Sequence, residues 1–300
     1  MSSFKLLDVT LRDGGHHSNF HFTDEQLDKI IPAIDATKVD FIEVGYRGGS
    51  ISPIPNIGIA GLCPDEYLLK CQKLIKNTKM AVMVHCQNIN KDDIKALKKC
   101  GVSLVRLCIQ KGEHKLAIPF IGYAKEAGML VSTNFIHISQ YPQDVIIEAV
   151  DSVIPYEPSM IYFADSNGCL HTHRVTALYE YFTKHYNIPF GYHAHDNIGL
   201  AQTNVLAALN AGAKFVDASL AGASKGIGNL KLEFFVAYLY SIKNYQFELE
   251  PLIAASNYVR DIFPECGDVS EGEFLRGIFD FSTKQLAQHI ASGKKGFKQS

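Results

Sequence analysis

The feature that most constrains the fold is a repeated alternation of short apolar runs with amphipathic, helix-like segments. The apolar runs have strand length and are rich in β-branched and aromatic residues. Eight of them cover residues 5–10, 40–45, 79–85, 103–109, 129–136, 159–164, 189–195 and 214–220. Near-continuous apolar runs are typical of strands that are buried on both faces. Strict alternation predicts a parallel sheet, and eight units close an α/β TIM (β/α)8 barrel.

Short local motifs support helices between these runs. Thr23 is followed three residues later by Gln26, which is a capping-box pattern at the start of a helix. Asn90 and Pro142 begin two further helical segments. A glycine ends three of the helices just before the next strand, as a left-handed C-cap requires: Gly101, Gly128 and Gly212.

An open, doubly wound sheet is the alternative to a barrel. It is disfavoured because no Gly-x-Gly-x-x-Gly fingerprint follows the first strand and no Gly-x4-Gly-Lys-Ser/Thr motif occurs. After about residue 243 the alternation stops, and residues 248–300 are typical of several helices with a glycine- and lysine-rich tail. We therefore predict a catalytic barrel at residues 1–243 and a short C-terminal helical extension at 244–300, since about fifty residues form a poor core alone.

Composition limits the kinds of molecule that the protein is expected to bind. The formal net charge is -2, so no global positive field attracts nucleic acid or an anionic membrane, and we expect a small-molecule ligand. The apolar runs are too short to cross a bilayer and the first residues lack the apolar core of a signal peptide, which predicts a cytoplasmic protein. The seven cysteines are scattered without a Cys-x-x-Cys pair, which argues against a disulfide framework or a zinc ribbon.

Two histidines at the seventh run are the first candidate metal ligands. His193 and His195 are two residues apart, so in a strand their imidazoles lie on the same face and can bind one divalent ion. Alone, a His-x-His pair is a weak signal because it also occurs by chance. Asp13, which follows the first run, would add one anionic oxygen and leave positions open for water and substrate. This mixed set suits Mn²⁺, Mg²⁺ or Co²⁺ better than a thiolate-rich zinc site does.

Polar residues collect at the carboxyl ends of the other runs as well, where barrel enzymes place their sites. A 2-oxo acid could chelate an open metal face through its carboxylate and keto oxygens, and Arg12 could stabilise a developing enolate beside it. The polar residues at the run ends are Asp8, Arg12, Asp13, His16, Glu43, Tyr46, His85, Arg106, Asp165, Ser166, Asn167, His193, His195 and Ser219.

Two motifs resemble those of the DRE-TIM metallolyase superfamily, which includes HMG-CoA lyase, isopropylmalate synthase and 4-hydroxy-2-oxovalerate aldolase. Asp8-Val-Thr-Leu-Arg-Asp-Gly-Gly resembles the signature D-x-T-L-R-D-G, and His193-Ala-His-Asp-Asn-Ile-Gly-Leu-Ala resembles H-x-H-(D/N)-N-x-G-L-A. The likeness covers residues 4–240, roughly the whole barrel. Two motifs this far apart and in the same order are highly specific, and they imply the barrel fold, a divalent metal ion and a 2-oxo acid substrate.

Within the superfamily, the segment from Arg12 to His16 is most similar to the aldolase pattern R-D-G-x-H. The resemblance implies that Arg12 stabilises the enolate and that His16 is the catalytic base. It also implies a serine that holds the pyruvyl carboxylate, an asparagine at the metal shell and an acid beside the arginine. The implied site residues are therefore Arg12, His16 and Glu43 as catalytic residues, Arg12, Ser166 and Asn229 as substrate-binding residues, and Asp13, His193 and His195 as metal ligands.

The chain also departs from the relatives in this superfamily. The segment from Leu220 to Gly228 holds no cysteine, whereas HMG-CoA lyase carries a catalytic one after the eighth strand. The synthases generally have a longer C-terminal region than residues 244–300 provide. The aldolases usually end in a helical domain that docks an aldehyde dehydrogenase and supplies a tyrosine, which this tail does not match. A dehydrogenase partner is therefore in doubt, and a homodimer stays open.

The sequence thus predicts a divalent metal-dependent aldolase that cleaves or forms a 4-hydroxy-2-oxo acid through a pyruvate enolate, with Mn²⁺ as the favoured ion. The alternatives are an acyl-CoA-dependent condensing synthase of the isopropylmalate or homocitrate type, an HMG-CoA lyase-like enzyme, and a catalytically dead barrel that serves as a scaffold. The intact set of Arg12, Asp13, His193 and His195 argues against the scaffold. The aldehyde half of the substrate is not specified.

Several candidate residues also have a structural alternative. Asp13 could cap a loop, and Ser166 and Asn229 could cap helices. His16 stands beside two further histidines, and all three could be solvated. Lys225, in the glycine-rich loop after the eighth run, could contact an anionic substrate group or be solvated.

Overall fold

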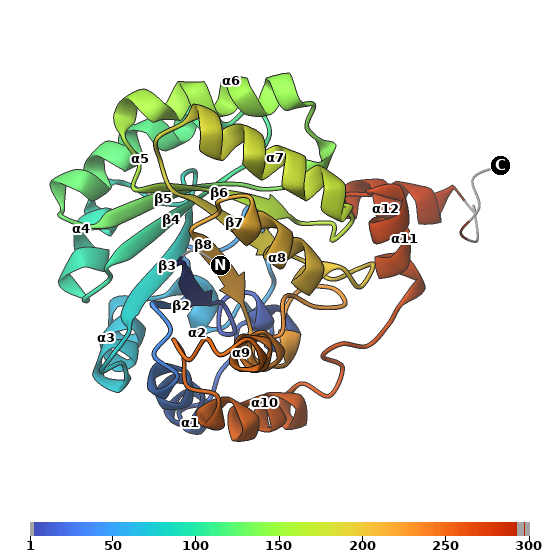
Figure 1. The fold of residues 1–300 in the computed structure, drawn as a ribbon. Helices are drawn as coiled ribbons and strands as arrows, with labels where there is room; N and C mark the ends of the chain where they lie inside the picture. The colour runs from blue at the N-terminus through green and yellow to red at the C-terminus, as the bar shows by residue number, and fades with distance from the viewer. Residues whose placement is uncertain (1–2, 293–296, 298–300) are drawn as a thin grey trace.

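Eight parallel strands close into a barrel in which each strand pairs with the next and β8 pairs with β1 (Figure 1). The computed structural model describes residues 3–292 and residue 297. It confirms the predicted (β/α)8 fold. The strands are β1 (Lys5–Asp8), β2 (Phe41–Arg47), β3 (Lys79–His85), β4 (Leu104–Ile109), β5 (Leu130–Phe135), β6 (Met160–Asp165), β7 (Phe190–Ala194) and β8 (Phe215–Ala218).

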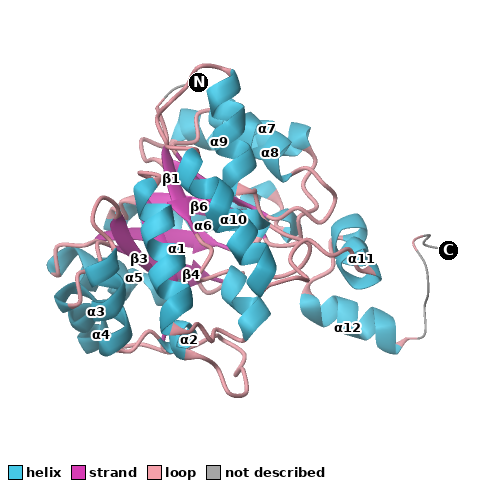
Figure 2. Ribbon diagram, turned by 90° about the horizontal axis from the view of Figure 1, so that it is seen from below, coloured by secondary structure: helices cyan, strands magenta, loops and turns pink. Residues whose placement is uncertain are grey.

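Helices follow every strand and enclose the barrel (Figure 2). The capping box at Thr23 forms as predicted, and Asn90 forms another. The three predicted C-cap glycines all have positive φ. The helices around the barrel are α1 (Asp24–Ala36), α2 (Ile59–Leu62), α3 (Asp65–Leu74), α4 (Lys91–Lys99), α5 (His114–Glu126), α6 (Gln143–Val153), α7 (Thr172–His185), α8 (Ala201–Asn210) and α9 (Leu232–Ser241).

The second strand departs from the prediction that it ends at residue 45. A bulge between Glu43 and Tyr46 shifts its register against β3, and the strand continues to Arg47. Gly45 makes this possible because its φ is +152° and a Cβ there would collide with the carbonyl of Ala60. Strands β1, β7 and β8 end earlier than predicted, so His195 lies just beyond its strand.

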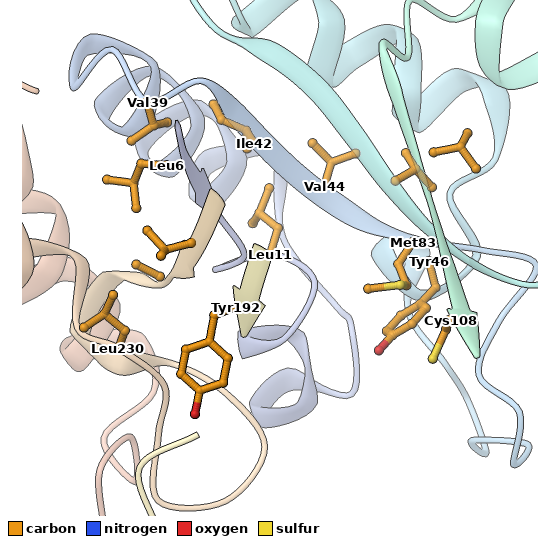
Figure 3. Packing of buried hydrophobic residues seen from close by; sticks show 14 of the residues in the cluster. Leu6, Leu11, Val39, Ile42, Val44, Tyr46, Met83, Cys108, Tyr192 and Leu230 are labelled. Carbon is orange, nitrogen blue, oxygen red and sulfur yellow. The ribbon is translucent and has the colours of Figure 1, made fainter. Parts of the chain in front are cut away.

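The barrel interior holds a cluster of buried apolar residues next to a layer of buried charged residues. The apolar cluster is formed by Leu7, Val9, Phe41, Ala81, Leu104, Met160, Tyr162 and Phe215. Tyr162 extends over Gly191, where a Cβ would collide with its ring, and the guanidinium of Arg106 lies 4.4 Å from the centre of that ring. Figure 3 shows a second apolar group, Met83, Tyr46 and Cys108, gathered where the strands end.

After α9, the chain forms one more helix that packs on the barrel and two helices beside the barrel mouth. In the described residues these are α10 (Glu250–Ile262), α11 (Glu271–Phe279) and α12 (Thr283–Ala291). Helix α10 packs against α1, whereas α11 and α12 lie to one side of the barrel (Figure 1). Residues 293–296 of the predicted glycine- and lysine-rich tail lie outside the described residues, and the division at residue 243 stays a prediction. No described helix is long and apolar enough to span a membrane.

Asp8, at the end of β1, is expected to make stability depend on pH. Burial raises the pKa of Asp8 from 3.8 to about 7, against hydrogen bonds from Thr10. An acid with a higher pKa in the folded state binds its proton more tightly there, so the free energy of unfolding falls as pH rises from 3.8 to about 7. This slope is at most about 1.4 kcal/mol per pH unit.

Asp8→Asn should remove that part of the slope, because asparagine does not titrate. Urea unfolding of the wild type and Asp8→Asn at about pH 5, 6 and 7 measures the difference between their free energies of unfolding. We expect this difference to shrink as pH rises, because only the wild type loses stability. A constant difference across this range would show that the carboxyl group of Asp8 does not retain its proton in the folded state.

Candidate active site

One cavity of about 470 Å³ opens at the carboxyl ends of the strands. Such a volume is typical of a small-molecule site. Six of the residues predicted from sequence line it: Arg12, Asp13, His16, Ser166, His193 and His195. The other two, Glu43 and Asn229, are buried directly behind this lining and hydrogen-bond Arg12 and Asp13.

Asp13, His193 and His195 form a compact cluster in which one potential ligand atom from each lies within 4.8 Å of the others. The Nε2 atom of His193 is 3.3 Å from Oδ2 of Asp13 and 3.3 Å from Nε2 of His195. The Nε2 atom of His195 is 3.7 Å from the same carboxylate oxygen. The structure therefore brings Asp13 together with two histidines that lie 180 and 182 positions later in the sequence.

Hydrogen bonds from residues outside the cluster orient the atoms that could bind a metal ion. Nδ1 of His193 lies 3.0 Å from Oδ2 of Asp217, which leaves Nε2 of His193 to face the cluster. Nδ2 of Asn229 donates to Oδ2 of Asp13 at 2.7 Å, and Asn229 also bridges to His195 through its backbone. Asn229 thus supports the cluster instead of capping a helix.

The chemistry of the cluster fits a divalent ion. Burial lowers the pKa of His195 to about 3, so its imidazole is neutral and has a free lone pair. Burial acts against the charge of Asp13, but Arg12 and the two histidines hold the pKa of its carboxyl well below the usual range. Oδ1 of Asn229 is buried and has no hydrogen-bond partner in the described structure. Two imidazoles, one carboxylate and an unused amide oxygen are ligands that Mn²⁺ and similar ions accept.

Arg12 is fixed beside this cluster by two carboxylates. Its Nε donates to Oε2 of Glu43 at 2.7 Å, and its Nη1 lies 3.0 Å from Oδ1 of Asp13. Arginine has five N–H donors, so these contacts leave others for a ligand in the cavity. The two carboxylates raise the pKa of Arg12 against the effect of burial, which keeps it charged.

A chain of buried ion pairs connects Arg12 to His193 through the barrel interior. Glu43 also accepts a hydrogen bond from Arg106 at 3.1 Å, and Arg106 donates to Asp217 at 2.7 Å. Asp217 then contacts His193. The role of Asp217 was missed from the sequence, although an acid at an inward position of an apolar strand is a signal for it.

The structure separates the three neighbouring histidines after β1. Only His16 of the three lines the cavity, and burial lowers its pKa to about 4, which makes the imidazole neutral at pH 7 but a weaker base than a free histidine. His17 stacks on Phe263 and contacts Glu265 at 3.2 Å. His21 hydrogen-bonds the carbonyl of residue 56.

Ser166 lies in the loop after β6 with its side chain at the cavity. Its hydroxyl oxygen accepts the backbone N–H of His137 at 3.0 Å, so its own O–H can be donated to a ligand. Its carbonyl oxygen accepts Nη2 of Arg276 at 2.8 Å.

Helices α11 and α12 supply cavity residues that sequence reasoning missed. Arg276 and Thr283 both line the cavity. Asp280, between these helices, accepts hydrogen bonds from Ser139 and Asn167 and so joins the C-terminal helices to the loops after β5 and β6. No local pattern in the sequence indicates these contacts, because they join segments more than 100 residues apart.

A closed (β/α)8 barrel with a possible Asp/His/His metal site and a fixed arginine at its mouth indicates a class of barrel enzyme. A profile of the HMGL-like family matches residues 3–259, and the chain belongs to that family. The resemblance seen in the two motifs is therefore confirmed, as is the prediction of an enzyme of the lyase class.

Individual relatives agree with this assignment. The chain is 32% identical to a 4-hydroxy-2-oxovalerate aldolase of Carboxydothermus hydrogenoformans over 78% of this chain and 70% of the relative. It is 27% identical to an oxaloacetate decarboxylase of Mycobacterium tuberculosis over 78% of this chain and 69% of the relative. Among solved structures, the N-terminal domain of a candidate aldolase from Bacteroides vulgatus covers 96% of both chains at 25% identity with a TM-score of 0.83.

Proposed function

We propose that this protein is a divalent metal-dependent aldolase that cleaves or forms a 4-hydroxy-2-oxo acid through a pyruvate enolate. One observation carries the proposal: the cluster of Asp13, His193 and His195 shares a cavity with a cation, Arg12, that is held by two buried carboxylates. Such a pairing suits stabilisation of an oxyanion. The aldolase names of several relatives support the same reaction.

Asp13, His193 and His195 would hold the ion, with Oδ1 of Asn229 in reach of the same cluster. We propose Mn²⁺ as the ion, with Mg²⁺ and Co²⁺ as alternatives that oxygen and nitrogen ligands also accept. When bound, the ion supplies Lewis acidity toward the carbonyl of a 2-oxo acid.

The chain's own residues account for the remaining steps of cleavage. His16, which is neutral, takes the proton of the 4-hydroxyl group as the bond between carbons 3 and 4 breaks. The electron pair of that bond passes to the pyruvyl half, where the N–H groups of Arg12 stabilise the enolate oxygen. The hydroxyl carbon leaves as an aldehyde. The proton held on His16 balances the proton that carbon 3 takes up to give pyruvate, whose carboxylate accepts the O–H of Ser166.

A second candidate is the decarboxylation of oxaloacetate, because one relative bears that name. It would pass through the same pyruvate enolate, with carbon dioxide leaving instead of an aldehyde. A CoA-dependent synthase uses an acyl-CoA as the nucleophile, and incubation with acetyl-CoA and a panel of 2-oxo acids would detect it by the release of free thiol.

Exchange of the methyl protons of pyruvate with deuterated solvent tests the shared enolate. The Mn²⁺-loaded enzyme is expected to catalyse this exchange without any aldehyde, as NMR of pyruvate would show. Arg12→Lys keeps the charge but loses the planar guanidinium that reaches both carboxylates and the ligand. It should therefore reduce the exchange at least about 10-fold while Mn²⁺ binding is retained.

The outcomes separate the alternatives. Absence of exchange with the wild type would count against the pyruvate enolate and favour the synthase. Exchange that survives Arg12→Lys would keep the aldolase but remove Arg12 from its role. If exchange is observed, cleavage assays with oxaloacetate and with 4-hydroxy-2-oxo acids decide between the two enolate reactions.

A further inference from the structure

We propose that Lys225 and Arg276 form a subsite for a carboxylate on the aldehyde half of the substrate, so that the acceptor is an aldehyde or ketone that also carries an acid group. This inference rests on the proposed aldolase function and supplies the chemical class of the half that the motifs leave open. It gives the C-terminal helices a part in substrate selection.

These residues form one wall of the cavity. Lys225 lies in the loop between β8 and α9, Arg276 on α11 and Thr283 at the start of α12, and all three line the cavity. The loop packs directly on α11, since a Cβ at Gly226 would lie 2.8 Å from Oε2 of Glu273. The metal cluster and Arg12 belong to other elements, the loop after β1 and the end of β7.

Lys225 differs from the other cations of the cavity. Arg12 and Arg106 are each held by two carboxylates, and Arg276 is paired with Glu273 at 2.8 Å. In the described part of the chain, Lys225 has no carboxylate within 4.0 Å, and its ammonium donates to Oγ1 of Thr283 at 3.2 Å. An ammonium has three N–H donors, so two remain for a ligand.

The surroundings of Lys225 favour the arrival of a negative charge. The side chain of Lys225 is exposed, so only part of its hydration is lost; this loss and the positive charge of Arg276 lower the pKa of Lys225, against the charges of Glu273 and Asp13. A bound carboxylate would relieve both effects, since it compensates the lost hydration and offsets the repulsion between the two cations.

Arg276 is held rigidly and keeps donor capacity. It is buried, and its guanidinium donates to the carbonyls of Phe281 and Ser166 and to the side chains of Glu273 and Asn167. These four bonds to described residues leave one of its five N–H groups unused. A rigid cation needs little ordering when it binds a ligand, which favours affinity.

The donor inventory suits a carboxylate. The two free N–H groups of Lys225 and the one of Arg276 can reach both oxygens of a carboxylate. Because Glu273 already pairs with Arg276, Lys225 supplies one positive charge, which a carboxylate matches, whereas a phosphate dianion would leave one negative charge without a partner. Apolar residues also line the cavity, including Ile51, Ile54 and Met83.

The same subsite disfavours loss of the bound carboxylate as carbon dioxide. A cation that pairs with a carboxylate stabilises the ground state, whereas decarboxylation moves the negative charge away toward the enolate. Interactions that are weaker in the transition state than in the ground state slow a reaction. The subsite therefore suits an acid group that is retained in the aldehyde product.

Binding to the metal-free protein tests the subsite without relying on turnover. Two substrates form a matched pair, 4-hydroxy-2-oxoglutarate and 4-hydroxy-2-oxopentanoate, which differ only in a terminal carboxylate or methyl group. Isothermal titration in the presence of EDTA should give a Kd at least about 10-fold lower for the dicarboxylate, as expected for a charge-assisted contact. Lys225→Gln should reduce this preference to less than about 3-fold.

Lys284→Gln is the matched control, because it removes one positive charge next to Thr283 on the outside of the cavity lining. It should keep the wild-type preference, which excludes a long-range charge effect. Equal affinity of the wild type for both ligands, or a preference that survives Lys225→Gln, would overturn the subsite. Pyruvate methyl exchange reports on the aldolase proposal separately: if exchange occurs without a preference for the dicarboxylate, only the subsite is wrong.

Discussion

Asp13→Asn is expected to weaken Mn²⁺ binding by at least about 100-fold, because it removes the anionic oxygen on which both histidines converge. The amide would also place an NH2 group against Nδ2 of Asn229 or Nη1 of Arg12, both of which donate to the wild-type carboxylate. Equilibrium titration of Mn²⁺ followed by electron paramagnetic resonance measures the free ion directly.

Asp196→Asn, in the loop after β7 next to His195, provides a control. The carboxylate of Asp196 accepts the backbone N–H of Ala201 at the start of α8, a role that asparagine also fills, and Asp196 does not line the cavity. This variant should bind Mn²⁺ as the wild type does. If Asp13→Asn kept an affinity within about 3-fold of the wild type, Asp13 would have to be removed from the ligand set.

His16→Ala is expected to lower kcat for cleavage of a 4-hydroxy-2-oxo acid by about 10²- to 10⁴-fold, the range for loss of a general base. The imidazole of His16 lines the cavity and is neutral, so it can accept the proton of the 4-hydroxyl. Mn²⁺ binding should be retained because His16 is outside the cluster of ligands. Pyruvate methyl exchange should fall much less than cleavage, since exchange does not involve a hydroxyl proton.

His17→Ala serves as the neighbouring control. His17 faces Phe263 and Glu265, so its loss should affect the packing of the end of α10 more than turnover. Thermal melting distinguishes the two effects. Turnover of His16→Ala near the wild-type level would transfer the base role to another proton acceptor, and a large loss of kcat in His17→Ala would identify that acceptor.

The fold was predictable because its signals are local. The capping box at Thr23 and the glycine at position 101 report on backbone geometry within a few residues, and buried parallel strands require apolar runs. The end of β2 was mispredicted because a glycine at the end of an apolar run usually indicates a turn. Gly45 instead forms a bulge that depends on the close approach of α2. That approach is a tertiary contact, so the sequence around Gly45 does not indicate it.

For the candidate site too, residues with a local sequence signal were predictable and residues placed by tertiary contacts were not. His193 and His195 could be paired from their spacing, and Asp13 from its motif. Asp217 could have been found only by following which residues of β8 face the barrel interior. Arg276 could not have been found, because α11 reaches the loop after β6 through contacts that depend on how the whole tail folds back.

The buried chain of ion pairs from Arg12 through Glu43, Arg106 and Asp217 to His193 has a consequence for how such a protein can diversify. Exchange of any one of these five groups removes a partner from at least one buried charge in the barrel interior, where an incompletely paired charge is costly. The wall formed by Lys225, Arg276 and Thr283 lies outside this chain and borders the same cavity. Under the proposed function, new acceptor specificities can therefore arise by changes in that wall and in α11 and α12, while the residues of the ion-pair chain stay unchanged.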